Sequence, residues 1–226
     1  MTASTSVRDA RHIVWDWNGT LLDDSHAVVS AVNTVCTAFG SEHVDLDRWR
    51  SVFGRPLLRT YELVLQRTLS ERDWARIDVL YHEAYRKLLH TCGLAAGVPE
   101  SLWEWSKRGG SQSLLSMWFH DELVPLVTDF GLDSLFTRVD GLRDDIGGGP
   151  KAAHLREHVR ALELDPAEIV LIGDVVDDAR AAEQAGSGCA LLTTGVMSRQ
   201  ALEATGFPVF DSVVEALESL EAGIAA

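Results

Sequence analysis

The second half of this chain alternates short apolar runs with segments of helical period. The β-like runs cover residues 112–116, 136–139, 169–172, 189–193 and 208–210. Helical patterns lie between them, at residues 99–107, 151–162 and 179–185. One more apolar run, at residues 12–15, stands near the start of the chain. Strands that alternate with helices predict a parallel, doubly wound sheet with right-handed crossovers, so we expect a Rossmann-like α/β core.

Between the first strand and this alternating region, the pattern is helical throughout. The expected helices span residues 26–39, 46–53, 56–68 and 71–89. In the first of them, Val28, Val32 and Val35 recur at helical spacing and form one apolar face. We therefore expect an all-helical insertion, residues 23–95, in a core built from residues 1–22 and 96–226.

Length and charge narrow the classes of function. A chain of 226 residues can bury a sizeable hydrophobic core. Its formal net charge of −14 argues against a nucleic-acid partner, because proteins that bind nucleic acids usually carry a basic face. A small phosphorylated ligand stays compatible, since a bound cation and a single lysine can reverse the sign of the charge inside a cleft.

The cysteines and the hydropathy pattern indicate where the protein works. Cys36, Cys92 and Cys189 have no paired spacing, which is typical of reduced thiols rather than of a disulfide framework or a zinc site. No apolar run reaches the ~20 residues that cross a bilayer. Residues 1–11 are polar and lack the apolar stretch of a signal peptide. We expect a cytoplasmic protein without a membrane partner, either a monomer or a homodimer.

Two of the predicted strands end in an aspartate. Asp16 follows the run at residues 12–15, and Asp174 follows the run at 169–172, with Asp177 and Asp178 close behind. Ligands of open α/β sheets bind at the carboxyl ends of the strands, where both carboxylates would lie. Clustered carboxylates suit a metal ion such as Mg²⁺. The pattern therefore indicates a metal site and, with it, phosphoryl chemistry.

Four short motifs, in order, resemble those of the haloacid dehalogenase superfamily. The family's Asp-x-Asp-x-Thr is similar to residues 16–20, which read Asp-Trp-Asn-Gly-Thr. The family's strand-ending Ser or Thr is matched by Ser116, its helix-opening lysine by Lys151, and its Gly-Asp-x-x-x-Asp by residues 173–178. The resemblance covers the chain from about residue 12 to 220. The Gly-Arg-Pro turn at residues 54–56 is similar to turns of phosphoglycolate-phosphatase-like members with a helical (C1-type) cap.

This resemblance implies a Mg²⁺-dependent phosphohydrolase that acts on a small phosphorylated metabolite. Asp16 would attack phosphorus and form an aspartyl-phosphate, which splits one difficult displacement into two easier ones. Asp16, Asp174, Asp178 and the backbone carbonyl of Asn18 would hold the Mg²⁺ ion, with Asp178 in a water-mediated or lysine-paired role.

The remaining matched residues would bind the phosphoryl group. Ser116 and Lys151 would grip its oxygens through a hydroxyl and an ammonium group. Gly19 and Thr20 would complete the first loop, and Met117 would line the site next to Ser116. We expect the neighbouring aromatic residues to serve mainly in packing, and substrate specificity to depend on the cap and on a loop after Ser116.

One position departs from the family pattern. Phosphatases of the family carry an acid/base aspartate two residues after the nucleophile, where this chain has Asn18. An amide does not titrate, so general acid–base help, typically worth ~10²–10⁴-fold in rate, cannot come from Asn18 itself. Three interpretations stay open: a leaving group that needs no proton, an acid elsewhere such as Asp24 or His26, or a chain that binds a phosphorylated ligand without turning it over. An engineered substitution is a further explanation.

Other branches of the resembling family fit the residues less well. Dehalogenases do not need the Mg²⁺ set, which is complete here. Phosphonate-cleaving members use a cap lysine as a Schiff base, and Lys87, the one lysine of the insertion, stands in a charged segment without the desolvation that such a lysine needs. A sugar-phosphate mutase stays an alternative, since its motifs overlap with those of the phosphatases.

Overall fold

A parallel six-stranded sheet forms the centre of the molecule in this computed structural model, which describes residues 10–143 and 150–224. The strand order is β5-β4-β1-β6-β7-β8, and each neighbouring pair is parallel. The strands are β1 (His12–Trp15), β4 (Ser111–Phe119), β5 (Val139–Leu142), β6 (Ile169–Gly173), β7 (Gly188–Leu192) and β8 (Val209–Phe210). The predicted doubly wound α/β sheet is therefore confirmed.

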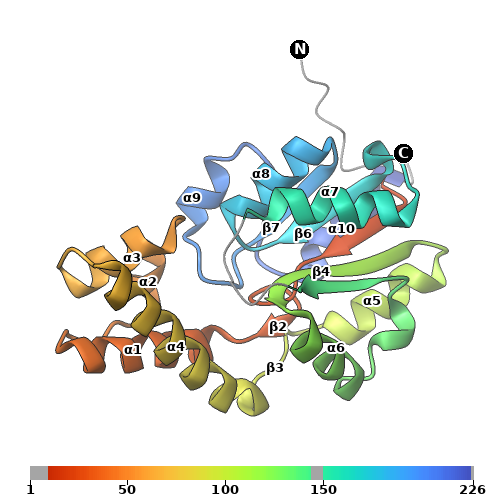
Figure 1. The fold of residues 1–226 in the computed structure, drawn as a ribbon. Helices are drawn as coiled ribbons and strands as arrows, with labels where there is room; N and C mark the ends of the chain where they lie inside the picture. Colours follow the sequence, from red (N-terminus) through yellow and green to blue (C-terminus); the bar gives the residue numbers. More distant parts are fainter. Residues whose placement is uncertain (1–9, 144–149, 225–226) are drawn as a thin grey trace.

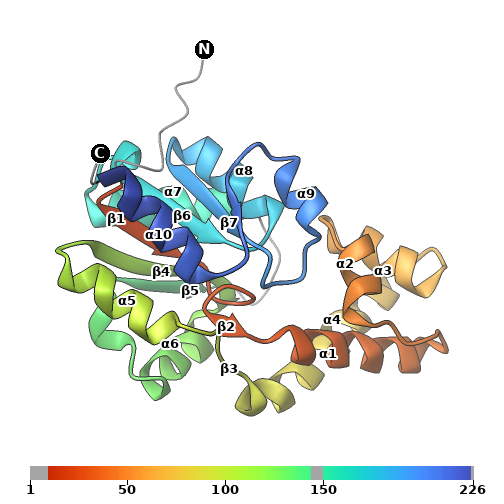
Figure 2. The same cartoon turned by 180° about the vertical axis from the view of Figure 1, so that it is seen from behind.

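Helices cover both faces of this sheet (Figures 1 and 2). One face packs against α7 (Lys151–Leu162), α8 (Val176–Ala185) and α9 (Arg199–Glu203). The other packs against α5 (Val98–Lys107), α6 (His120–Asp129) and α10 (Val213–Ile224). Strand β1 is buried on both sides: Val14 belongs to the first core, whereas Ile13 and Trp15 belong to the second. Such two-sided burial explains why the central strands are continuous apolar runs.

The predicted helical segment between the first strand and the rest of the sheet is also present. It contains α1 (Ser25–Phe39), α2 (Leu46–Val52), α3 (Leu57–Leu65) and α4 (Glu71–Leu88), followed by a 3₁₀ turn, Leu89–Thr91. We call residues 25–91 the helical block. A two-stranded antiparallel ribbon joins it to the core, formed by β2 (Leu22–Asp23) and β3 (Gly93–Leu94). The block lies beyond the edge of the sheet at which β1 ends (Figure 1). Its status as a separate domain, 23–95, stays a prediction.

Two predicted segments differ from the structure. The strand expected at 136–139 lies at Val139–Leu142, because residues 133–135 form a 3₁₀ turn and the buried Phe136 packs at its end rather than in the ladder. The loop expected after Ser116 is also wrong. Strand β4 continues to Phe119 and leads directly into α6, whose first residue is His120.

Within the described ranges, no helix is both long and apolar enough to cross a membrane.

Candidate active site

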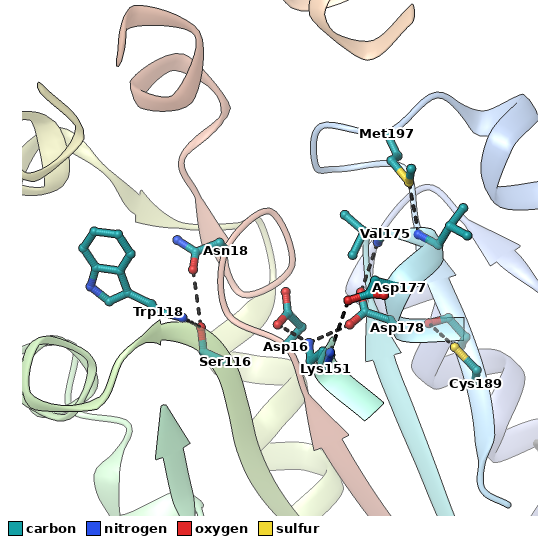
Figure 3. A network of polar contacts seen from close by, with 12 residues as sticks. Asp16, Asn18, Ser116, Trp118, Lys151, Val175, Asp177, Asp178, Cys189 and Met197 are labelled. Atoms are coloured by element: carbon teal, nitrogen blue, oxygen red, sulfur yellow. Dashed lines mark hydrogen bonds and ion pairs between the residues drawn. The ribbon is translucent and has the colours of Figure 1, made fainter. Parts of the chain in front are cut away.

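Three carboxylates meet at the carboxyl end of the sheet. Asp16 follows β1 and Asp174 follows β6, and these strands are neighbours in register, with Trp15 opposite Ile172. Asp178 lies in the first turn of α8. All three residues are buried, and each contributes a carboxylate oxygen to a cluster whose atoms lie within 4.8 Å of one another. The three residues therefore lie together, as the sequence predicted. Figure 3 shows two of them, Asp16 and Asp178, beside Lys151.

Lys151 provides the ammonium group inside this cluster. It is the first residue of α7, and its side chain is only 2% exposed. Its Nζ donates a hydrogen bond to Asp16 Oδ1 and forms an ion pair with Asp178 Oδ1 at 2.6 Å (Figure 3). The backbone N–H of Lys151 donates to Asp177 Oδ2 at 3.3 Å, which ties the start of α7 to the start of α8. One cation thus bridges the strand-end carboxylate and the helix carboxylate.

Glycines let the surrounding backbone approach Asp174. Gly19 has a left-handed φ of +71°, and a Cβ atom placed on it would lie 2.6 Å from Asp174 Oδ2. A Cβ atom on Gly195, in the loop after β7, would lie only 1.7 Å from the same oxygen. The N–H of Val196 donates to this oxygen at 3.2 Å. The carboxylate of Asp174 is therefore enclosed by backbone that no side chain separates from it.

Burial controls the protonation of this cluster. It raises the pKa of Asp16 to about 6, although Lys151 acts in the opposite direction. It raises the pKa of Asp174 well above its usual range, and the charges of Asp16 and Asp178 add to this effect. Burial alone would lower the pKa of Lys151, but the two adjacent carboxylates outweigh it, so that pKa lies above its ordinary value.

This imbalance of charge fits a divalent cation. Three buried carboxylates share one ammonium group, so the cluster carries excess negative charge where water is largely excluded. The donor atoms are oxygens, which Mg²⁺ prefers over nitrogen or sulfur. The buried residues thus match the predicted metal-ligand set of Asp16, Asp174 and Asp178.

Ser116 and Asn18 face each other beside the cluster. Ser116, in β4, accepts a hydrogen bond from the N–H of Trp118 at 3.0 Å and donates to Asn18 Oδ1 at 3.4 Å (Figure 3). The amide nitrogen of Asn18 donates to Asp24 Oδ2 at 3.0 Å and to the Tyr85 hydroxyl at 2.7 Å. These bonds fix the orientation of the amide, with its oxygen toward Ser116.

Asp24 is a buried acid at the position that an acid replacing Asn18 would need. Tyr85 donates to its Oδ2 at 2.5 Å, the Gly19 N–H donates to its Oδ1 at 2.9 Å, and burial raises its pKa. His26, the other residue considered for this role, is exposed and pairs with Thr91 on the surface. The structure therefore brings Asp24, but not His26, to Asn18.

A cavity of about 650 Å³ opens from this cluster into the helical block. On the side of the core, the cavity is lined by Asp16, Asn18, Met117, Lys151, Asp174, Asp177 and Asp178. The sequence had placed all of these at the site except Asp177. Ser116, Gly19 and Thr20 are not among its lining residues; Thr20 is fully buried, and its hydroxyl has no partner among the described residues. Their contact with a phosphoryl group stays a prediction.

Comparison with known proteins places this geometry in a family. A sequence model described as haloacid dehalogenase-like hydrolase matches residues 13–192. The chain belongs to this family.

Curated relatives agree with this membership. The chain is 28% identical over 201 residues to a phosphoglycolate phosphatase of Synechococcus elongatus, an alignment that covers 85% of this chain and 88% of the relative. It is 26% identical over 196 residues to phosphoglycolate phosphatase 1 of Pseudomonas aeruginosa, covering 84% and 72% of the two chains.

Solved structures share the fold. A haloacid dehalogenase-like hydrolase from Streptococcus pneumoniae superposes with a TM-score of 0.79 at 18% identity, covering 93% of this chain and 98% of the other. A protein from Haemophilus somnus, described as a predicted phosphoglycolate phosphatase, has a TM-score of 0.76 at 20% identity, covering 93% and 97%. The family resemblance read from the four motifs is thus confirmed, as is the α/β fold that it implied.

Several residues of the site in this haloacid dehalogenase-like hydrolase were missed at the sequence level. Tyr85 contacts Asn18 across 67 positions of the chain, and Trp49, Tyr61 and Trp74 come from three different helices of the block. The sequence carried no signal for them, because an aromatic content of 8% is ordinary and does not distinguish a cavity wall from a core. Arg55 belongs to a turn that the sequence did single out, and its Nε lies 3.7 Å from Asp177 Oδ2.

Proposed function

We propose that this hydrolase cleaves phosphate monoesters of small metabolites by way of an aspartyl-phosphate at Asp16. One observation carries the proposal: the buried strand-end carboxylate of Asp16 lines a cavity, and Lys151 and two further carboxylates stand beside it. A nucleophile held next to a cation is the arrangement that phosphoryl transfer to a carboxylate needs. The phosphatase names of the relatives support the same reaction.

The reaction has two displacements at phosphorus. In the first, a carboxylate oxygen of Asp16 forms a bond to phosphorus while the bond to the leaving oxygen breaks, and that oxygen takes up a proton. In the second, water attacks phosphorus, the acyl-phosphate bond breaks, phosphate departs and Asp16 is restored. Lys151 and the hydroxyl of Ser116 would neutralise and orient the phosphoryl oxygens in both steps.

Asp16, Asp174 and the backbone carbonyl of Asn18 would hold Mg²⁺, and Asp178 would keep Lys151 in place, as its 2.6 Å contact supports. A bound Mg²⁺ ion supplies neutralisation of the phosphoryl charge. Asn18 would orient rather than titrate, because both hydrogens of its amide nitrogen are engaged by Asp24 and Tyr85. The proton for the leaving oxygen would come from solvent or from a neighbouring acid.

The helical block would act as a cap that excludes bulk water from the reacting groups. Its four helices contribute much of the cavity wall opposite Asp16, which supports this role. A cytoplasmic location and a monomeric or homodimeric state, both expected from the sequence, belong to this proposal as well.

The test is hydrolysis of p-nitrophenyl phosphate with Mg²⁺ and with excess chelator, in the unaltered protein and in Asp16→Asn. We expect Mg²⁺-dependent turnover, and a loss of about 10³-fold or more in Asp16→Asn. Asp129→Asn, an exposed change at the end of α6, serves as the matched control and should retain the activity.

Acid quench during turnover, followed by mass spectrometry of the peptide containing Asp16, tests the covalent step. A phosphorylated peptide in the unaltered protein is the expected result. Mg²⁺-dependent binding of phosphate without turnover of any ester would contradict the proposal and favour a ligand-binding protein, the alternative that Asn18 raises.

A further inference from the structure

Much of the wall of the cavity is apolar and rich in aromatic rings. Six of the rings that line it are Trp49, Tyr61, Trp74, Tyr81, Tyr85 and Trp118. They contact one another in two groups. Tyr61 lies between Trp49 and Trp74, with ring centroids 5.8 and 6.1 Å away, and Tyr85 lies between Tyr81 and Trp118, at 5.9 and 5.0 Å. Aromatic pairs of this kind are typically worth about 0.5–1.5 kcal/mol beyond the area that they bury.

The charges around the cavity disfavour a second anionic group on the ligand. Among the described lining residues, six are aspartates and only Arg55 and Lys151 are arginine or lysine. Lys151 is held by Asp16 and Asp178, and Arg55 lies 3.7 Å from Asp177. A carboxylate on the leaving group would therefore lose its hydration against an apolar wall without gaining a cation of its own.

Tyr61 and Tyr81, two of these aromatic residues, also carry a hydroxyl group. Tyr61 and Tyr81 both line the cavity, and neither hydroxyl has a hydrogen-bond partner among the described residues. The side chain of Tyr61 is nine-tenths buried or more, and burial raises the pKa of both phenols, so each stays a neutral donor. Neither hydroxyl oxygen is among the enclosed polar atoms that lack a partner in the described residues, so each is open to an acceptor on a ligand.

We infer that the leaving group of the substrate is an uncharged, largely apolar alcohol of ring size that also carries a hydrogen-bond acceptor for the tyrosine hydroxyls. The inference rests on the proposed function, since the same cavity contains Asp16 and Lys151. Its volume of about 650 Å³ exceeds by far what a two-carbon acid such as glycolate fills. The ester of a small hydroxy acid is thus a poor match for this wall, whatever the relatives act on.

Primary alkyl phosphates test the inference, because their leaving groups differ in size but little in basicity. We expect kcat/KM to rise from ethyl through butyl to 2-phenylethyl phosphate, by at least about tenfold overall, since each buried CH₂ is worth roughly fourfold. We expect 4-methylbenzyl phosphate to exceed 4-carboxybenzyl phosphate, and every one of these esters to exceed 2-phosphoglycolate in kcat/KM. A flat series, or preference for either carboxylate, would overturn the inference while leaving the phosphatase proposal intact.

Variants of the lining residues test whether the aromatic wall causes the preference for apolar leaving groups. Trp74→Ala should reduce the ratio of kcat/KM for 2-phenylethyl over ethyl phosphate by about tenfold, whereas Trp103→Ala, an exposed change on α5, should leave that ratio unchanged. Tyr61→Phe should lower kcat/KM only for esters whose leaving group carries a hydrogen-bond acceptor. The ratio of kcat/KM for 4-acetylbenzyl phosphate over 4-ethylbenzyl phosphate should therefore fall. An equal ratio in Trp74→Ala and the unaltered protein would contradict the assignment of this wall.

Calorimetry with non-hydrolysable phosphonates separates the inference from turnover. Binding of 3-phenylpropylphosphonate should be at least tenfold tighter than that of phosphonoacetate, with a negative heat-capacity change that Trp74→Ala diminishes. If p-nitrophenyl phosphate is not cleaved at all, the proposed function fails, but this binding preference still decides the inference. Tighter binding of phosphonoacetate would refute it.

Discussion

Asn18 is best understood through its contact with Asp24. In the family pattern this position is an acid, and here an amide nitrogen donates to the carboxylate of Asp24 and to the hydroxyl of Tyr85. A carboxylate at position 18 would have no hydrogen to donate and would face a second buried carboxylate. Two such groups cannot both be ionised at short range without a large cost. The departure at position 18 is therefore matched by the acid at position 24.

Asn18→Asp should consequently destabilise the protein at pH 7.5. We expect a loss of about 1–3 kcal/mol in the free energy of unfolding, because a buried donor is replaced by a like charge. Adding Asp24→Asn to Asn18→Asp should restore most of the lost free energy of unfolding. Urea unfolding of the two single variants and the double variant, in metal-free buffer, gives the coupling free energy directly. Additive losses would mean that the two side chains do not interact.

At the scale of elements, the loop that follows β7 closes the site from the side of Asp174. Ala at position 195 would bring its methyl group within 1.7 Å of Asp174 Oδ2, so the loop or the carboxylate must shift. Arg50 of α2 also holds this loop, donating to the carbonyl of Gly195 at 2.7 Å. The helical block and the carboxylate cluster are thus linked through one short stretch of backbone.

Gly195→Ala should raise the Mg²⁺ concentration for half-maximal activity by 10–100-fold, the usual cost of disturbing the groups that orient a metal ligand. Gly93→Ala is the matched control, because nothing lies within 4 Å of a Cβ atom placed there. Titration of activity with Mg²⁺ and thermal unfolding of both variants provide the measurements. The same half-saturation in both variants would show that Asp174 is not held by this loop.

Elements also show what the sequence could and could not predict. The strands that deliver Asp16 and Asp174 were predicted because continuous apolar runs end in carboxylates, and α7 was predicted to the residue, Lys151–Leu162. Strand β5 was misplaced because its residues, Val139–Leu142, include a charged residue and a glycine, while the apolar Phe136 lies outside it. Helix α6 was missed since it follows β4 without a loop to mark its start. The aromatic cavity wall depends on which faces of three helices meet, and no single segment encodes that.

On the scale of the whole molecule, a network of hydrogen-bonded polar side chains crosses the core away from the cavity. His12 bonds Ser111 and Ser113 at 2.7 and 2.8 Å, Ser113 also bonds His158 at 2.8 Å, and His158 bonds Asp140 at 2.7 Å. Ser113, His158 and Asp140 have the spacing of a hydrolytic triad, yet Ser113 is fully buried. No substrate can reach that hydroxyl, so the arrangement serves to satisfy polar groups between sheet and helix.

The buried polar network around His12 makes the stability of the protein sensitive to acid. Burial, and then the charge of His158, lowers the pKa of His12 to about 4 from an ordinary value of 6.5. The unfolded state therefore binds the proton first as pH falls, and the stability present above about pH 6.5 is lost on the way to pH 4. From this residue we expect a loss of about 2 kcal/mol between pH 7.5 and pH 5.

His12→Gln removes the titrating group and keeps a polar side chain of similar length. Urea unfolding at both pH values should show a smaller difference in this variant than in the unaltered protein, by about the same 2 kcal/mol. The comparison therefore reports the titration of His12 together with its electrostatic coupling to His158. An equal loss of unfolding free energy in both proteins would mean that other residues cause the acid sensitivity.

The pairing of β1 with β6 also bears on synthesis. Asp16 emerges from the ribosome before Lys151, Asp174 and Asp178, and Lys151 already lies 135 positions further along the chain. Until then β1 lacks one of its two neighbours and presents an unpaired apolar edge, which is prone to pair with other chains. A chain interrupted before Asp178 lacks part of the acidic cluster. Activity of this hydrolase would therefore show that translation had passed that residue.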